Sequence, residues 1–364
     1  MAIFDLSYAM QEFSTRVQNM VDIVPKVDIG FKNFFGERIE KTKGFDFWVT
    51  RQGRPVAVDI NPLERGIITG LEKSTHKFFI PPTFDYSVIY SAFEEFETIY
   101  GATDNKVDGE IFAKLVEKTA KEMQANIARI ERREELQRAQ ALLTGIVTLK
   151  NGDNIDFKRK AASLVAYNNS FGWDISTNSP SKILIQLIEF LITEGMVDPT
   201  MGINVLVGTE AQAAFKENAT RAKEGDIKDQ TYMQLSTGET IRGLTPQGSY
   251  SAGNYKVNLW GYTGYYDDPD TSVTTSYMDS KKIIVLPNQA PFEMVYCGTK
   301  GWSDGDGYGA NAYPRIIKGK RNFYKIKDIR GCSIEEGVRS AVVASLREVD
   351  RVATAQVVGS AQQG

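Results

Sequence analysis

A single long helix, predicted over residues 107–143, limits how this chain can be built. Asp108 can cap it, because the carboxylate can accept hydrogen bonds from free amides of the first turn. The apolar residues recur on one narrow stripe: Phe112, Val116, Ala120, Met123, Ile127 and Ile130. At 1.5 Å per residue the helix would be about 55 Å long, more than the width of a small domain. We therefore expect one face to stay open to solvent or to a neighbouring molecule.

Charged residues cover the rest of this helix. Three pairs of opposite charge stand four residues apart, a spacing that lets the partners meet on one helical face: Glu117–Lys121, Lys118–Glu122 and Glu134–Arg138. Pairs of this kind add roughly a few tenths of a kcal/mol each to the stability of a helix. We therefore expect a modest contribution from each pair.

The residues before the helix, 36–86, are interpreted as a long extended arm. Apolar and polar residues alternate over 45–49 and over 56–60, with a turn at 51–54, and a return strand is expected near 76–80. Nothing nearby in the sequence can bury the aromatic and basic side chains of the arm, so we expect them to pack on another copy of the chain. The predicted interface residues are Phe47, Trp48, Arg51, Arg54, Arg65, Phe78 and Phe79.

After the long helix the pattern predicts a hairpin and then an α/β portion. Asn151-Gly152 suits a two-residue hairpin turn, in which both positions need positive φ. Ser179-Pro180 opens an apolar helix, residues 203–207 read as a buried strand, and Thr209 is expected to cap the next helix. The other predicted elements are an amphipathic helical piece within 1–35 and strands near 255–262, 282–286 and 338–358.

Composition limits the function. Of 364 residues, 42% are hydrophobic and 24% are charged, which is near the average for soluble globular proteins. The formal net charge of −3 lacks the basic excess of a dedicated nucleic-acid binder. Cys297 and Cys332 show neither metal-ligand nor disulfide spacing, as expected in a reducing cytoplasm. The apolar run 183–192 is too short to cross a bilayer, and no secretory signal is visible.

No catalytic residue, cofactor site or metal ligand is predicted. The single histidine, His76, falls in a predicted strand and reads as a surface or interface residue. Residues 205–209 are similar to the start of a nucleotide-binding turn but lack its further glycines. Asp304 and Asp306 lie in a glycine-rich loop that could wrap calcium. Arg315 stands where the closing glutamate of such a site belongs, so a solvated loop is favoured.

Several short motifs follow one another in a recognisable order. They are Val24-Pro25 with Asn33-Phe34-Phe35, Val58-Asp59-Ile60 with Pro62 and Arg65-Gly66, Phe79-Ile80-Pro81-Pro82, the charged helix, Ile155 to Arg159, Val205 to Gly208 with Ala211, Ala214 and Phe215, and Met278-Asp279 before residues 282–287. In this order they resemble the lambda-type major capsid proteins of tailed phages, the capsid protein E family, over nearly the whole chain. The glycine-rich stretch from Trp302 to Asn311 departs from the family pattern by being longer.

The resemblance implies an α+β chain with the Hong Kong 97 phage capsid fold. The implied parts are an N-terminal arm (1–35), an extended loop (36–86), a peripheral domain (87–165) with its spine helix (107–143), an axial domain (166–288), and a return to the peripheral domain with C-terminal strands (289–364). The implied function is that of a major capsid protein. It would assemble in the host cytoplasm into the hexamers and pentamers of an icosahedral or prolate virion head around double-stranded DNA.

The resemblance also implies partners. These are other copies of the chain, a scaffold protein, a portal protein, a candidate decoration protein and packaged DNA in non-specific contact, with no membrane. Two other functions stay open: an encapsulin-like nanocompartment subunit or other phage structural protein, and a hydrolase that uses carboxylates at 265–270 or at Asp304 and Asp306. For a shell protein, we expect deletion of residues 44–71 to leave a folded subunit that cannot close a shell.

Overall fold

The computed structural model describes residues 30–50, 74–91, 109–149, 154–220, 233–234, 243–269, 271–302, 313–327 and 333–359. The helices are η1 (Gly30–Phe34), α3 (Gly109–Thr144), η2 (Ala161–Ser163), α4 (Pro180–Thr193), η3 (Pro199–Met201), α5 (Thr209–Glu217) and η4 (Val349–Arg351). The strands are β1 (Phe35–Ile39), β2 (Phe45–Thr50), β3 (Ser74–Phe79), β4 (Thr83–Ser91), β5 (Ile146–Thr148), β6 (Asn154–Asp156), β7 (Leu164–Val165), β8 (Ile203–Val207), β9 (Met233–Gln234), β10 (Leu244–Ala252), β11 (Tyr255–Tyr262), β12 (Tyr265–Asp267), β13 (Thr274–Ser276), β14 (Lys282–Pro287), β15 (Phe292–Cys297), β16 (Thr299–Trp302), β17 (Pro314–Ile317), β18 (Asn322–Lys327), β19 (Ser333–Leu346) and β20 (Ala353–Gln356).

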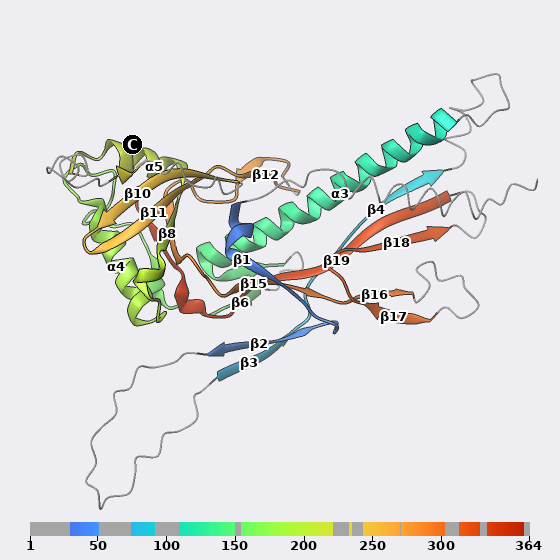
Figure 1. Ribbon diagram of the computed structural model, residues 1–364, viewed down its shortest axis with the longest axis horizontal. Helices are drawn as coiled ribbons and strands as arrows, with labels where there is room; N and C mark the ends of the chain where they lie inside the picture. The colour runs from blue at the N-terminus through green and yellow to red at the C-terminus, as the bar shows by residue number, and fades with distance from the viewer. Residues whose placement is uncertain are drawn as a thin grey trace, which may run out of the picture.

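The molecule is elongated (Figure 1). An α/β lobe with α4 and α5 lies at one end, and α3 runs away from it along a second sheet. The lobe is built on seven strands in the order β7-β20-β14-β8-β11-β10-β9. All residues of the central strand β8 are buried, which is typical of a strand covered on both faces. The buried strand predicted at 203–207 is therefore confirmed.

Helix α4 covers part of this sheet. The Ser179 side chain accepts a hydrogen bond from the Ser181 amide, and Pro180 occupies the first turn, where its missing N–H has no cost. Leu184 and Leu187 of α4 are fully buried in one cluster with Val205 of β8. The sequence signal for this helix is therefore confirmed, including its start.

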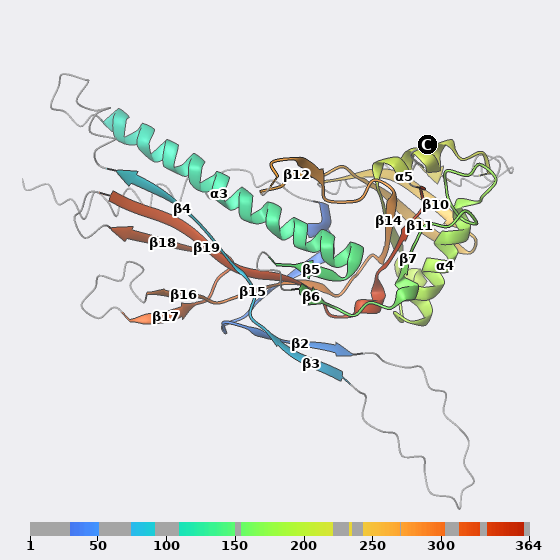
Figure 2. The same cartoon turned by 180° about the vertical axis from the view of Figure 1, so that it is seen from behind.

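The second sheet carries the long helix. Its order is β1-β15-β19-β18. Strand β4 also pairs with β19, on the edge opposite β18. Seen from behind, α3 runs beside β4 and β19 (Figure 2). Met123 and Ile130 of α3 are buried in a cluster with Val338 of β19, against which Phe84 and Val88 of β4 pack. The part of the predicted apolar stripe from Ala120 to Ile130 thus faces this sheet.

Helix α3 lies close to the predicted range 107–143, but its charged residues have two different environments. Glu117 and Lys121 form an exposed pair 2.7 Å apart, as expected on an open face. Glu134 and Arg138 have the same spacing, yet each side chain is only 2% exposed. The predicted Glu134–Arg138 pair is therefore confirmed, but it is buried, because η1, β15 and the segment before β18 cover this half of the helix.

Helix α3 ends at a glycine for a steric reason. Gly145 has a φ of +73°, a conformation that residues with a Cβ rarely adopt. Its N–H donates to the Ala141 carbonyl at 3.0 Å, which closes the last turn. A Cβ there would lie 2.5 Å from the Arg159 side chain. Arg159 itself donates to the carbonyls of Leu142, Ser163 and Val352, so the helix end is bonded to segments that flank the seven-stranded sheet.

The prediction that Thr209 caps α5 is wrong. Thr209 is the first helical residue, and Gly208 before it has an extended backbone and no side chain to donate or accept. The Ala211 amide instead donates to the Ser280 carbonyl at 2.9 Å. A Cβ on Gly208 would lie 2.5 Å from the Asp279 carbonyl oxygen. The close approach of the segment before β14 therefore excludes a capping side chain and supplies the acceptor itself.

The remaining predictions of secondary structure divide into two groups. The hairpin around Asn151-Gly152 is confirmed by the pairing of β5 with β6, and the strands near 255–262 and 282–286 are β11 and β14. Predictions for residues 1–29 and 51–60 lie outside the described residues, as does Cys332.

No described helix is both long enough and apolar enough to cross a membrane. The division into domains stays a prediction.

Candidate functional site

The β2–β3 hairpin projects away from the body of the molecule (Figures 1 and 2). Its strands are antiparallel, with Phe45 opposite Phe79 and Thr50 opposite Ser74. Neither strand pairs with any other strand in the described part of the chain. A two-stranded hairpin is marginally stable unless it packs on a further surface. The hairpin is therefore a candidate for contact with another molecule.

The hairpin is fixed to the body at its root. Phe45 is 6% exposed and belongs to the core cluster that includes β15 and β19. Phe79 packs on the same cluster, with its ring centroid 6.4 Å from that of Phe45. Phe78, on the opposite face of the same strand, is 59% exposed. Gly44 permits this close packing, because a Cβ there would lie 2.5 Å from the Phe79 carbonyl oxygen.

The segment between β1 and the hairpin is held by β15. The Glu40 amide donates to the Tyr296 carbonyl at 2.8 Å, which extends the pairing of β1 by one residue. The Gly298 amide donates to the Thr42 carbonyl at 2.9 Å. Both bonds join backbone to backbone, so they hold the hairpin root in addition to the packing of Phe45 and Phe79.

A pocket of about 290 Å³ opens beside this root. We call it the root pocket. Its lining includes Lys43 before β2, Ile80 and Pro81 after β3, Lys300 of β16 and Arg339 of β19. It therefore combines three cationic side chains with an apolar wall.

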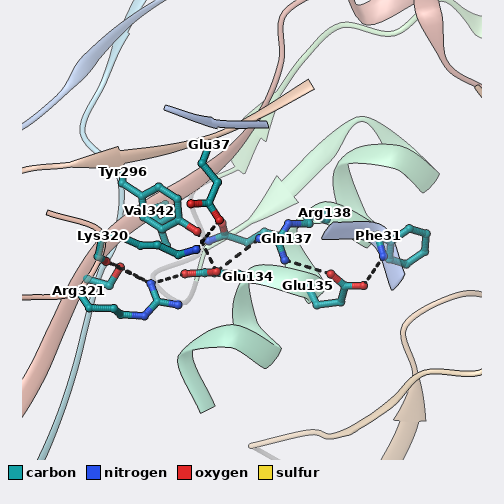
Figure 3. A network of polar contacts seen from close by, with 11 residues as sticks. Phe31, Glu37, Glu134, Glu135, Gln137, Arg138, Tyr296, Lys320, Arg321 and Val342 are labelled. Atoms are coloured by element: carbon teal, nitrogen blue, oxygen red, sulfur yellow. Dashed lines mark hydrogen bonds and ion pairs between the residues drawn. The ribbon is translucent and has the colours of Figure 1, made fainter. Parts of the chain in front are cut away.

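A buried charge network lies between α3 and the end of β15 (Figure 3). Glu134 Oε1 lies 2.6 Å from Arg321 Nη1, and Glu134 Oε2 accepts a hydrogen bond from the Tyr296 hydroxyl at 3.1 Å. Arg138 Nη1 donates to Glu135 Oε2 at 3.1 Å, and its Nη2 lies 3.5 Å from Glu134 Oε2. Two carboxylates and two guanidinium groups thus balance in charge within the protein interior.

Glu135 extends the network to two further elements. It accepts hydrogen bonds from the Phe31 amide at 2.7 Å and from the Tyr262 hydroxyl at 3.2 Å. The rings of Phe31 and Tyr262 are stacked with centroids 4.3 Å apart. Helix α3 is thereby joined to η1 and to the end of β11. The network connects the two sheets and the N-terminal end of the described chain at one point.

The electrostatics of the network fit a structural joint. Burial raises the pKa of the Glu135 carboxyl, although Arg138 and the two hydrogen-bond donors oppose the rise. Burial would lower the pKa of Arg321, but the ion pair with Glu134 outweighs it and the pKa is raised.

Burial also raises the pKa of the Cys297 thiol to about 11, which keeps it protonated, as expected for a cysteine used as a small apolar residue.

The carboxylates considered for a hydrolase support local structure. Asp267 accepts a hydrogen bond from the Thr274 hydroxyl at 2.7 Å, across the β12–β13 pair. Asp268 accepts from the Thr271 amide at 3.1 Å in the turn of the same hairpin. Asp304 and Asp306 lie outside the described residues. Within the described ranges, no three His, Cys, Asp or Glu residues are grouped so as to hold a metal ion.

The predicted interface residues are distributed along the hairpin. Phe47 and Trp48 lie on β2, opposite Lys77 and His76 of β3. Phe78 is exposed, whereas Phe79 is partly buried at the root. Arg51, Arg54 and Arg65 lie outside the described residues. The interface role of all seven stays a prediction.

The comparisons with known proteins identify the family. A family model described as phage major capsid protein E matches residues 100–322, which is more than half of the chain. The chain belongs to this family. Its function as a phage major capsid protein, expected from the sequence motifs, is confirmed. No curated protein matches the capsid protein along its sequence.

One solved structure in particular shows the fold of the capsid protein. The capsid protein is similar to a prophage protein of E. coli CFT073 assigned as a capsid protein, with a TM-score of 0.63 at 11% identity, over 96% of this chain and 98% of that chain. It is also similar to the mature capsid of bacteriophage PhiM1 (TM-score 0.47, 10% identity, 92% and 89% of the chains). A third likeness is to the SrpI encapsulin of Synechococcus elongatus PCC 7942 (TM-score 0.45, 11% identity, 100% and 99%).

The predicted α+β architecture of the Hong Kong 97 type is confirmed for the capsid protein. Members of its family are structural proteins that associate with their own copies in the virion shell.

Sequence reasoning missed the buried network and the root pocket. Lys43, Lys300 and Arg339 carry no motif, because the fold brings them together from three distant parts of the chain.

Proposed function

We propose that this capsid protein assembles into the hexamers and pentamers of a closed phage head, with its β2–β3 hairpin lying across a neighbouring copy. The observation that carries the proposal is the hairpin itself. Its root is buried through Phe45 and Phe79, whereas its strands leave the body and expose Phe78. Large exposed aromatic side chains on a projecting element are typical of protein–protein contacts.

The proposal further includes a shell that encloses double-stranded DNA, with scaffold and portal proteins as partners and a decoration protein as a further candidate. The formal net charge of −3 would not bind DNA tightly, since tight binding requires many cationic contacts to phosphates. The proposal includes assembly in the host cytoplasm, no catalytic activity and no cofactor. The described acidic residues of β12 and its turn have local structural partners.

Electron microscopy tests the proposal directly. The full chain, expressed alone and together with its neighbouring genes, is expected to give closed shells with six-fold and five-fold clusters of subunits. Analytical ultracentrifugation of the same samples should show large particles in equilibrium with small oligomers. A chain that remains a folded monomer at high concentration under all of these conditions would contradict the proposal.

Two phenylalanines of the hairpin should separate assembly from folding. Phe78→Ala removes an exposed ring, so the thermal unfolding of the free subunit should not change, but the yield of shells should fall. Phe45→Ala removes a ring that is 6% exposed, and should destabilise the subunit by roughly 3 kcal/mol. Scanning calorimetry of subunits and particle counts by microscopy measure the two effects. Normal shell yield from Phe78→Ala would exclude this ring from the interface.

A further inference from the structure

The root pocket has a charge that the described part of its own subunit does not neutralise. Arg339 is paired, because its Nε donates to Asp85 Oδ2 at 2.7 Å and its Nη1 donates to the Lys300 carbonyl at 2.8 Å. Lys43 and Lys300 are exposed, and neither ammonium group has a carboxylate partner among the described residues. The pocket therefore presents two uncompensated positive charges beside a third that Asp85 balances.

Apolar side chains surround these charges. Ile80, which lines the pocket, is 54% exposed. Phe78 lies against Gly44, next to Lys43, and is 59% exposed. Ile316 lies against Gly298 of the pocket wall and is 46% exposed. Protein interfaces combine apolar centres with charged groups in this way, whereas nucleic-acid surfaces are more polar and more uniformly basic. The mixture favours a protein occupant over DNA.

We propose that the root pocket receives a carboxylate side chain from a second copy of this chain, which forms ion pairs with Lys43 and Lys300. This inference rests on the proposed self-assembly. Each copy can supply the group, because the chain has 46 acidic residues against 43 basic ones. A volume of about 290 Å³ accommodates an acidic side chain but not a folded element. The pocket adjoins the hairpin root, so the same contact would fix the direction in which the hairpin leaves the body.

Chemical coupling tests the contact in assembled particles. Shells are formed from an equal mixture of unlabelled and heavy-nitrogen-labelled chains, then treated with a water-soluble carbodiimide that joins amines to carboxylates in direct contact. We expect mixed-label peptides that link Lys43 or Lys300 to an Asp or Glu, and we expect none from dissociated subunits. Shells without such peptides would overturn the pocket assignment alone. Failure of the unsubstituted chain to form shells would overturn the proposed function, and with it the inference.

Charge reversal gives an independent measure. Lys43→Glu with Lys300→Glu should reduce shell yield at least about tenfold at about 0.15 M salt, because like charges placed together at an interface cost several kcal/mol. Lys43→Arg with Lys300→Arg should retain assembly. The control is Lys118→Glu on the exposed part of α3, and all three variants should unfold thermally like the parent.

Assembly of the double Glu variant at the parental yield would contradict the inference. DNA is the alternative occupant. It would be identified if Lys43 and Lys300 in filled particles become reactive to acetylation only after nuclease treatment, and this result would also overturn the inference.

Discussion

A chain in which Asn-Gly replaces residues 48–76 is expected to fold as a soluble subunit and to form no closed shells. Phe47 and Lys77 are direct partners in the β2–β3 register, so a two-residue type I′ turn can join them without changing the pairing below. Phe45 and Phe79 remain in place and keep the root packed on the core. Only the projecting part of the hairpin is removed, and with it the contact proposed to lie on a neighbouring copy.

The position of the cut matters. Deletion of 44–71, as the sequence alone suggests, would also remove Gly44 and the buried Phe45, and would confuse loss of assembly with loss of folding. Thermal unfolding of the Asn-Gly variant should match that of the parent chain, and gel filtration should show a small species. Closed shells of normal size seen by electron microscopy would show that the projecting hairpin is not needed for closure.

Glu134→Leu is expected to lower the free energy of unfolding of the subunit by about 3–5 kcal/mol, because it removes one partner of a buried ion pair. Arg321 and Arg138 would then lose the carboxylate that lies 2.6 Å and 3.5 Å from their guanidinium groups. The Tyr296 hydroxyl would lose its acceptor as well. Urea unfolding of the unassembled subunit, followed by circular dichroism, measures the change.

Helix α3 supplies a matched control. Glu117→Leu is the same substitution at a pair of the same spacing, but Glu117 and its partner Lys121 are exposed, so no resolvable change is expected. Combining Glu134→Leu with Arg321→Met should recover part of the lost stability, since Arg138 keeps Glu135 at 3.1 Å and no buried charge is then left without its partner. Equal effects of Glu117→Leu and Glu134→Leu would show that the network has no special energetic role.

Local patterns in the sequence were sufficient for most regular elements of the fold. The stripe from Ala120 to Ile130, the Ser179-Pro180 helix start and the Asn151-Gly152 turn each act within a few residues, and the structure has a helix or hairpin at each place. The four-residue spacing of Glu134 and Arg138 is equally local. This spacing does not indicate whether the pair is buried, because its burial depends on Arg321 and Tyr296, which are distant in the chain.

The candidate site was predictable only in outline. Alternation over β2 and β3 indicated a projecting hairpin, but not which of two adjacent aromatic residues faces inward. Phe79 packs on the core and Phe78 is exposed because the strand pleat turns them to opposite faces. The Thr209 cap failed for a related reason, since the acceptor at the α5 start is a carbonyl of Ser280 from another part of the chain.

The attachment of the hairpin root to β15 gives the subunit a defined route for mechanical load. A force on the hairpin would reach Tyr296 through the hydrogen bond from the Glu40 amide, and the Tyr296 hydroxyl is bonded to Glu134 of α3. From Arg138 and Glu135 the strain continues to Phe31 and Tyr262. Tension between neighbouring subunits would therefore be distributed over β15, α3, η1 and β11, rather than carried by the hairpin strands alone.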